Sequence, residues 1–330
     1  MPDTAVSEAH WRPSADRSTL QARAQLLAEL RAFFAERGVL EVETPILCAA
    51  ANPDPAVEPL HLDADLTGTG TRRWYLQTSP EFAMKRLLAA GSGPIYQVCK
   101  VLRADERGRR HHPEFTMLEW YRPGFSLEDL MDEVAALMRR LVHRPELPME
   151  RLRYRELFVQ RLGVDPWTAT VVELQALAHA RGIADARRLD LDTDGWLDLL
   201  MSHILESDLG RDGLTFVYDY PASQAALAQV LPGPPSVARR FELYWQGMEL
   251  ANGFDELLDA PEQRRRFADD DAERAAGKQP PLPTDEHLLA ALDSGLPACA
   301  GVALGLDRLL MCALDAEHID AVLAFPAQRA

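Results

Sequence analysis

Residues 94–121 read PIYQVCKVLRADERGRRHHPEFTMLEWY and already indicate the architecture. Two runs rich in apolar, β-branched and aromatic residues, 94–103 and 114–121, flank a ten-residue polar loop and predict two strands. On either side of this pair, strand-like and helical segments are mixed without the regular βαβ alternation of a parallel sheet. We therefore predict an α+β fold, with an antiparallel β-sheet flanked by helices.

The same signals divide the rest of the chain into expected elements. Helices are predicted at 20–34, from Ser79 to Gly91, at 126–143, at 262–278 and from Asp307 onward. Strand-like runs lie at 39–44, 74–77, 214–218 and 241–253, and an irregular loop is predicted at 48–70. The mainly helical stretch 150–212 is interpreted as packing without chemistry. We expect 1–17 to be a loose arm and 18–330 a single catalytic domain.

Composition and simple motifs exclude several classes of protein. The 330-residue chain has 51 acidic residues against 35 Lys and Arg, and its net charge of −16 disfavours non-specific binding to nucleic acid or anionic lipid. No apolar run is long enough to span a membrane, and the N-terminus lacks a signal-peptide pattern. The four cysteines form no CxxC pair, which favours a cytoplasmic protein. Neither a P-loop nor a dinucleotide fingerprint is present.

The loop at 103–115 carries four arginines and two histidines in an otherwise acidic chain. Arginine presents a planar fork that suits phosphate, so this loop predicts an anion site, although a solvated hairpin tip is the alternative. The strand that follows favours the site, because its alternation places Phe115, Met117, Glu119 and Tyr121 on one face. We interpret that face as the wall of a pocket.

A second candidate segment, 241–256, has acids inside apolar, strand-like sequence. Buried carboxylates need a partner, commonly a cation or a bound ligand, so Glu242 and Glu249 are candidate ligands of a divalent metal. Asn252 and Glu256 alternate onto one face, whereas Glu249 has the opposite parity. These three residues can lie on one face only if the strand contains a bulge or bend, and Gly253 is a candidate position for it. An exposed face with scattered acids is the alternative.

The third candidate segment is 299–310, where a glycine-containing strand runs into a helix. Gly301 and Gly305 allow a ligand to approach the backbone closely, although an ordinary turn explains them as well. Asp307 is predicted to cap the helix. Arg308 would then lie in the first turn, where the helix dipole disfavours a cation, and this indicates an anionic partner.

Three stretches of the chain, in this order, resemble the signature motifs of class II aminoacyl-tRNA synthetase catalytic domains. The stretch 38–45 is similar to motif 1, whose proline lies at a dimer interface in that class. The pattern Arg103-x-Asp105 with His111-x-x-x-Phe115 is similar to motif 2, and 305–308 is similar to motif 3. Within the class, 112–117 and 250–257 resemble the lysine-site segments of lysyl-tRNA synthetases.

The resemblance is more specific to the stand-alone paralogs of lysyl-tRNA synthetase, which ligate lysine or (R)-β-lysine to a lysine side chain of elongation factor P. The catalytic pattern starts near residue 20, so we expect no anticodon-binding domain and no tRNA partner. The segments at 78–81, 114–123, 216–225 and 301–305 are similar to those paralogs. Residue 303 is Ala where lysyl-tRNA synthetases usually have Gly, and in this family the larger residue is associated with (R)-β-lysine.

The resemblance implies an ATP-dependent, AMP-forming ligase that uses Mg²⁺ and forms a homodimer. Arg103 and Arg308 would be catalytic, contacting the α- and γ-phosphates, and Glu242 and Glu249 would hold the metal. Residues implied to bind ATP are Arg103, Ala104, Asp105, His111, His112, Phe115, Glu249, Leu250, Gly305 and Arg308. Residues implied to bind the amino acid are Ser79, Pro80, Glu81, Glu119, Tyr121, Asn252, Phe254, Glu256 and Ala303.

Two departures from the family pattern lie in motif 2. The family commonly has Arg-Asn-Glu where this chain has Arg103-Ala104-Asp105, and His-Asn-Pro where it has His111-His112-Pro113. We expect His112 to face solvent rather than ATP. The alternatives to a ligase of elongation factor P are a truncated synthetase that acylates tRNA or a small acceptor, and a catalytically inactive paralog that acts as a binding subunit. The sequence identifies no general base for the transfer step, no acceptor residue and no preferred lysine isomer.

Overall fold

A computed structural model of the chain describes residues 11–330, which form two compact units. The first unit contains the chain up to Tyr121 together with Asp259–Pro297 and Leu304–Ala330. The second contains Arg122–Leu258 and Ala298–Ala303. The prediction of one catalytic domain over 18–330 stays a prediction. Of the predicted N-terminal arm, residues 1–10 lie outside the described part.

The first unit carries a parallel and an antiparallel strand pair and a separate small sheet. Strand β1 (Leu40–Glu41) pairs in parallel with β5 (Ile95–Leu102), and β5 pairs antiparallel with β6 (Glu114–Pro123) from Ile95 opposite Tyr121 to Leu102 opposite Glu114. The strand-like runs predicted at 94–103 and 114–121 are therefore confirmed as strands, and their pairing agrees with the predicted antiparallel sheet. The small sheet contains β2 (Leu47–Cys48), β4 (Arg72–Leu76) and β3 (His61–Ala64) in that order.

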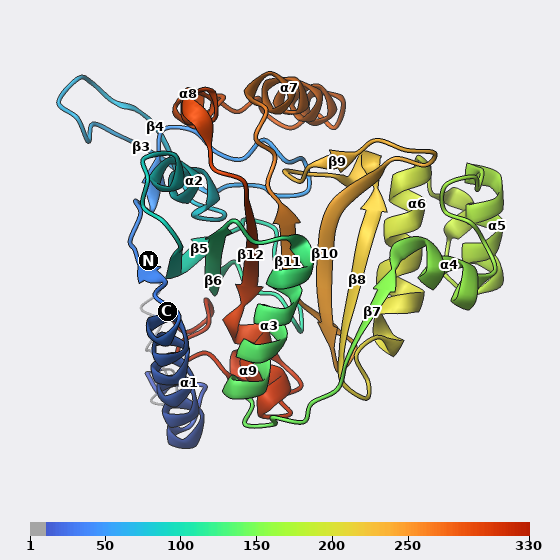
Figure 1. Cartoon of the computed structure of the whole chain (residues 1–330), viewed down its shortest axis with the longest axis horizontal. Coiled ribbons are helices and arrows are strands. Elements are labelled where there is room, and N and C mark those ends of the chain that lie inside the picture. The colour runs from blue at the N-terminus through green and yellow to red at the C-terminus, as the bar shows by residue number, and fades with distance from the viewer. Residues whose placement is uncertain (1–10) are drawn as a thin grey trace, which may run out of the picture. The chain divides into compact units, whose positions relative to one another are not determined.

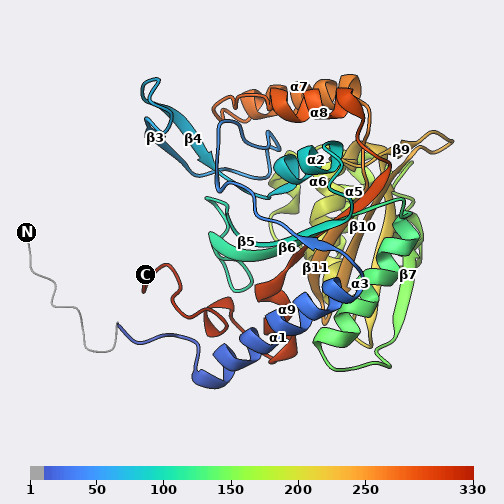
Figure 2. The ribbon, with the colours of Figure 1, turned by 60° about the vertical axis from the view of Figure 1, so that its left-hand side comes forward.

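The described part of the first unit contains five α-helices. They are α1 (Arg17–Glu36), α2 (Glu81–Ala89), α7 (Ala260–Ala276), α8 (Glu286–Gly295) and α9 (Leu306–Ala313), followed by the short η5 (Ile319–Ala321). Asp16 caps α1 by accepting from Thr19 N at 2.8 Å, and Gly38, with a positive φ of 65°, follows its end. Figure 2 shows α7 and α8 side by side above α2, and the β3–β4 hairpin extending to one side.

The second unit is built on strands that pair mainly antiparallel. Their order is β12 (Cys299–Gly305), β11 (Met248–Asp255), β10 (Val237–Trp245), β8 (Leu214–Pro221) and β7 (Met149–Arg153), with the short β9 (Val230–Leu231) paired to β10 (Figure 1). The β8–β10 and β10–β11 pairs are antiparallel, whereas β7 and β8 are parallel. The predicted antiparallel sheet is therefore mixed, with one parallel pair in each unit.

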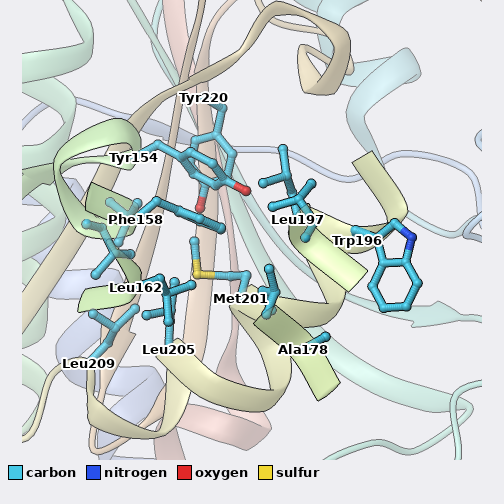
Figure 3. Packing of buried hydrophobic residues seen from close by; sticks show 14 of the residues in the cluster. Tyr154, Phe158, Leu162, Ala178, Trp196, Leu197, Met201, Leu205, Leu209 and Tyr220 are labelled. Atoms are coloured by element: carbon cyan, nitrogen blue, oxygen red, sulfur yellow. The ribbon is translucent and has the colours of Figure 1, made fainter. Parts of the chain in front are cut away.

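Helices of the second unit pack against this sheet around an aromatic core. They are α3 (Leu127–Leu141), α4 (Tyr154–Leu162), α5 (Val171–Ala180), η1 (Ala186–Arg188), α6 (Thr193–Leu200), η2 (Met201–Leu205), η3 (Glu206–Asp208) and η4 (Ala222–Gln224). Ser126 and Asp129 form a capping box that begins α3. Figure 3 shows Tyr154 and Tyr220, with ring centroids 4.7 Å apart, beside side chains from α4 and α6.

The structure departs from the predicted elements at a few places. The loop predicted at 48–70 contains β3, because His61–Ala64 finds hydrogen-bonding partners on β4 that no local pattern reveals. The strand predicted at 39–44 is reduced to β1, and the stretch 150–212 begins with part of strand β7. Among residues 11–330, no helix combines the length and the apolar character required to cross a membrane.

Candidate active site

The predicted site residues fall into two groups, one in each unit. The first-unit group is carried by the loops before α2 and after β5, by β6, and by the start of α9. The second-unit group lies on β10, β11 and β12, with Glu256 just beyond β11. Among residues 11–330, no cluster of three or more His, Cys, Asp or Glu side chains is arranged to hold a metal ion.

Arg103 lies directly after β5 and is held by three contacts. Its Nε donates to the carbonyl oxygen of Thr78 at 3.3 Å, and its Nη1 donates to Glu106 Oε1 at 3.0 Å. The guanidinium carbon lies 5.2 Å from the centroid of the Phe115 ring. Two residues predicted to act on one ligand are therefore neighbours, and Glu106, which the sequence analysis did not select, occupies part of the cationic surface.

Arg308 and His111 form the second cationic contact of this group. Arg308 Nη2 lies 2.6 Å from His111 Nε2, and Arg308 Nε donates to the carbonyl oxygen of Arg110 at 3.2 Å. Burial and the neighbouring Arg308 lower the pKa of His111 below its usual value. A neutral His111 accepts a hydrogen bond from Arg308 at Nε2, so this pair carries one positive charge at neutral pH.

The role predicted for Asp307 is wrong. Helix α9 begins after Gly305 without a side-chain cap, and Asp307 lies within its first turn. The buried Asp307 carboxylate accepts from Arg23 of α1 and from the backbone N of Thr116 on β6, the latter at 2.6 Å. Asp307 therefore ties α1 and β6 to the helix that carries Arg308.

The prediction that His112 faces solvent is wrong. Its ring is 8% exposed, Nε2 accepts from the backbone N of Ala327 at 2.8 Å, and Nδ1 lies 2.6 Å from the carbonyl oxygen of Glu114. Since Nε2 is an acceptor, the proton of the neutral ring is on Nδ1. The ring anchors the chain near its C-terminus to motif 2, and both ring nitrogens are engaged.

A hydrogen-bonded carboxylate lies on β6. Glu119 is 2% exposed, and its two oxygens accept from Ser79 Oγ at 2.7 Å and from Tyr121 OH at 2.6 Å. This contact confirms that Glu119 and Tyr121 share one face of the strand. Burial, followed by repulsion from the nearby Glu81, raises the pKa of Glu119 to about 7. Such a carboxyl group is poised to bind an ammonium group.

Glu81 is already paired within α2. Lys85 Nζ donates to Glu81 Oε1 at 2.6 Å, and both side chains are buried. Glu81 was predicted to bind the amino acid, whereas Lys85 was not predicted, although the spacing of four residues on a helix was a usable signal. A cavity of about 360 Å³ in the first unit borders Ser79, Pro80 and Glu81 on one side and Asp285 and His287 on another.

In the second unit, a bulge brings the predicted polar residues onto one face. Glu242 on β10 is opposite Asn252 on β11, and Tyr244 is opposite Glu249. Leu250 has no partner in this register, so the bulge predicted for this strand is confirmed, and it lies at Leu250 rather than at Gly253. Glu249 and Asn252 therefore share a face despite their opposite parity.

Glu242 is fully engaged by neighbouring side chains. Its Oε2 accepts from the hydroxyls of Tyr220, at 2.7 Å, and Tyr244, and its Oε1 accepts from Arg240. As placed, Glu242 does not fit a metal ligand, because a cation would have to displace Arg240. Glu249 is a half-buried carboxylate on the same face and has the chemistry that Mg²⁺ takes alongside phosphate oxygens.

The remaining predicted residues differ in exposure. Pro80, Leu250 and Glu256 are buried, Asp105 is exposed, and an intermediate exposure is shared by Ala104, Phe254, Ala303 and Gly305. The stretch 150–212, to which we assigned no chemistry, contributes Asp198 of α6, which accepts from Gln224 Nε2 at 2.9 Å. Burial raises the pKa of Asp198 to about 6. Gln224 also contacts Arg240 through its carbonyl oxygen, so α6 is linked to the strand that carries Glu242.

Gly253 is required by packing. A Cβ atom at this position would lie 2.5 Å from the Phe241 ring and 3.1 Å from the carbonyl oxygen of Gly301. We expect Gly253→Ala to lower the free energy of unfolding by about 1–3 kcal/mol, the usual effect of overpacking. Chemical denaturation measures this change. The control is Gly277→Ala after α7, where φ is −74° and the nearest atom is 3.5 Å away, and equal loss in both variants would contradict the prediction.

Comparison with known proteins shows the family. A family model described as tRNA synthetases class II (D, K and N) matches residues 7–329. The chain belongs to the class II tRNA synthetases. This assignment confirms the predicted fold class, and it places 38–45, 103–115 and 305–308 of this class II synthetase chain within the matched region.

Curated relatives of this class II synthetase chain share one name, Elongation factor P--(R)-beta-lysine ligase. The relative from Vibrio vulnificus is 49% identical over 325 residues, which cover 97% of this chain and 98% of the relative. The relative from Pseudoalteromonas translucida is 49% identical over 323 residues, with the same coverage. The relative from Photobacterium profundum is 47% identical over 317 residues, covering 96% of this chain and 98% of the relative.

Proposed function

We propose that this chain is an ATP-dependent ligase that activates (R)-β-lysine or lysine as an aminoacyl adenylate and transfers it to a lysine side chain of elongation factor P. The observation that carries this proposal is the identity of 46–49% over nearly the whole chain to relatives of that name. The fold of the class II tRNA synthetases and the cationic and acidic groups of the first unit agree with it.

The triphosphate of ATP is the proposed ligand of the cationic groups. Arg103 contacts the α-phosphate, Arg308 the γ-phosphate and His111 the outer phosphates, while Phe115 stacks on adenine. The contacts of Arg103 with Phe115 and of Arg308 with His111 support these roles. Residues proposed to complete the ATP site are Ala104, Asp105, His112, Glu249, Leu250 and Gly305, with His112 acting through its backbone, since its ring is engaged.

Mg²⁺ is proposed to accompany ATP, held by Glu249 together with phosphate oxygens. The ion would withdraw charge from the phosphates when bound. Glu242 is proposed to act indirectly, because its oxygens are occupied by Arg240 and two tyrosines.

The amino acid is proposed to bind through its charged ends. Glu119, hydrogen-bonded by Ser79 and Tyr121, pairs with an ammonium group, while Glu81 has its charge balanced by Lys85. Asn252 addresses the carboxylate. The residues proposed to shape the rest of the site are Pro80, Phe254, Glu256 and Ala303, with Ala303 favouring (R)-β-lysine over lysine.

The reaction proceeds in two steps. An oxygen of the amino-acid carboxylate attacks the α-phosphorus in line, the bond to the β-phosphate breaks, and pyrophosphate leaves. Arg103 and Arg308 stabilise the charge that develops on the phosphate oxygens, so the chain acts by positioning and electrostatics rather than as a nucleophile. The neutral ε-amine of the acceptor lysine then attacks the adenylate carbonyl, AMP leaves, and an amide forms.

Glu106 competes with the nucleotide for Arg103. Its carboxylate lies 3.0 Å from Arg103 and 3.9 Å from His111 Nε2, among the groups proposed to bind phosphate. We expect Glu106→Gln to lower the KM for ATP by roughly three- to tenfold, because the half-exposed ion pair no longer has to be broken. Glu114→Gln, whose carboxylate is exposed beside Lys100, is the control. An unchanged or raised KM for ATP in Glu106→Gln would contradict the prediction.

Three further properties are part of the proposal. The stretch 38–45 resembles motif 1, and this resemblance supports a homodimer. The net charge of −16 disfavours tRNA as the acceptor. The acceptor is a translation factor, and this supports a cytoplasmic location.

Amino-acid-dependent exchange of pyrophosphate into ATP tests the activation step. We expect exchange with (R)-β-lysine, and with lysine at a higher KM. Absence of exchange with both isomers would leave an inactive binding subunit as the better explanation. Incubation with labelled amino acid and either tRNA or elongation factor P then identifies the acceptor: label on the factor supports the ligase, and label on tRNA overturns it.

A further inference from the structure

Arg240 is the centre of a network in the second unit that the sequence analysis did not select. Its side chain is 18% exposed and makes three directed hydrogen bonds, through a different nitrogen in each case. Nη2 donates to Glu242 Oε1, Nη1 donates to the carbonyl oxygen of Gln224 at 3.0 Å, and Nε donates to Asn252 Oδ1 at 3.2 Å. The guanidinium also lies over the Tyr220 ring, 4.6 Å from its centroid.

The groups around Arg240 hold its guanidinium in one position. Glu242 is itself fixed, because its other oxygen accepts from Tyr220 and Tyr244. The Gln224 side chain is anchored to Asp198 of α6 at 2.9 Å. A planar guanidinium with fixed acceptors on two nitrogens has its third donor, Nε, aimed in a defined direction. That donor forms its hydrogen bond with Asn252 Oδ1.

Arg240 determines which way the Asn252 amide points. A guanidinium only donates hydrogen bonds, so the side-chain atom of Asn252 that faces it is the carbonyl oxygen. The amide nitrogen, Nδ2, therefore points away from Arg240, and among residues 11–330 it has no hydrogen-bond partner. A half-buried NH₂ group in this orientation offers two donors to a ligand, and a carboxylate is the matching acceptor.

We propose that Arg240 is a positioning residue that orients the Asn252 amide as a donor to the carboxylate of the amino-acid substrate, with Glu242 as its anchor. The proposal rests on the proposed function in one respect, namely that Asn252 contacts the amino acid. In this proposal, Arg240 and Glu242 together orient the substrate through Asn252. Without Arg240, the amide can rotate, and its carbonyl oxygen would then face the carboxylate and repel it.

The neighbouring Arg239 provides a matched control. It lies on the same strand with the opposite parity, and its partners are the carboxylates of Glu128, Asp219 and Asp255. Arg239 has a similar side-chain exposure, 14%, and equally close ion pairs, but it does not contact Asn252. Any general effect of replacing a paired arginine on β10 will therefore appear in both positions.

The test compares Arg240→Lys with Arg239→Lys by pyrophosphate exchange, using whichever lysine isomer the wild-type enzyme activates. Lysine keeps the positive charge beside Glu242, so the variant is expected to fold, but it lacks the planar fork and the Nε donor. We expect Arg240→Lys to raise the KM for the amino acid roughly 10- to 100-fold, the usual effect of losing an oriented hydrogen bond to a charged group, with the KM for ATP unchanged. Arg239→Lys should change neither the KM for the amino acid nor the KM for ATP by more than twofold.

A double-mutant cycle with Asn252→Ala distinguishes positioning from structural support. If Arg240 acts through Asn252, then Arg240→Lys will add no further increase in KM when Asn252 is already Ala. An unchanged KM in Arg240→Lys, equal increases for ATP and amino acid, or a full effect in the Asn252→Ala background would each overturn the proposal. Calorimetric binding of the amino acid without ATP gives the same comparison without turnover. An inactive wild-type enzyme would contradict the proposed function, and unchanged affinity of Arg240→Lys would contradict the role of Arg240.

Discussion

Arg308→Ala is expected to slow adenylate formation roughly 10²–10³-fold, on the scale of losing one donor to the charge that develops in a transition state. Arg308 lies in the first turn of α9, where the helix dipole disfavours a cation. A cation held at this position is best satisfied by an anionic ligand. Arg103→Ala is expected to have an effect of the same size.

Single-turnover formation of the adenylate measures this prediction, because it separates chemistry from product release. Arg265→Ala on α7 is the control, since Arg265 is exposed and its ion pairs with Glu262 and Asp269 are local. We expect the control to retain the wild-type rate. A loss below tenfold in both Arg103→Ala and Arg308→Ala would contradict the proposed phosphate contacts.

Glu119→Gln is expected to raise the KM for the amino acid about 10²-fold, because the substrate ammonium group loses a buried carboxylate partner. The wild-type KM should fall as the pH rises through about 7, where Glu119 ionises, and the variant should lose this dependence. Exchange kinetics across this pH range measure both effects. Glu156→Gln on α4, an exposed acid, is the control. A wild-type KM that is constant through pH 7 would contradict the assignment.

The same substitution is expected to stabilise the unliganded protein at high pH. The pKa of Glu119 is raised to about 7 in the folded state, from an ordinary value of 4.5, so the folded state holds a proton that the unfolded chain releases. The stability of the wild type therefore falls as the pH rises from about 4.5 through about 7. Glutamine stays neutral, so its melting temperature should exceed the wild-type value at pH 8 and match it at pH 4. A melting temperature of Glu119→Gln below that of the wild type at pH 8 would contradict this prediction.

The sequence predicts those features of the fold that depend on local patterns. The two β-rich runs beside the polar loop were sufficient to predict β5 and β6 as strands, and Ser126 as a cap was sufficient to predict the start of α3. The pairing of His61–Ala64 with β4 was missed, because only the tertiary partner makes that short polar segment a strand. The parallel pairs escaped prediction for the same reason.

The candidate site shows the same division. Alternation predicted that Glu119 and Tyr121 share a face, and the opposite parity of Glu249 predicted a bulge or bend in this strand, for which Gly253 was the candidate. The position of the bulge depends on the register with β10, and a single sequence does not contain that register. Arg240 and Arg239 are adjacent and chemically identical, so nothing local distinguishes the one that contacts Asn252. His112 was expected in solvent because its partner, Ala327, is more than two hundred residues away along the chain.

The most direct test of the central claim is the intact mass of elongation factor P after incubation with this protein, ATP and (R)-β-lysine. We predict that the mass rises by one lysyl residue, that the modified residue is a lysine, and that Arg308→Ala prevents the change. Lysine in place of (R)-β-lysine should give the same increase more slowly. An unchanged mass with both isomers, under conditions in which the adenylate forms, would contradict the account.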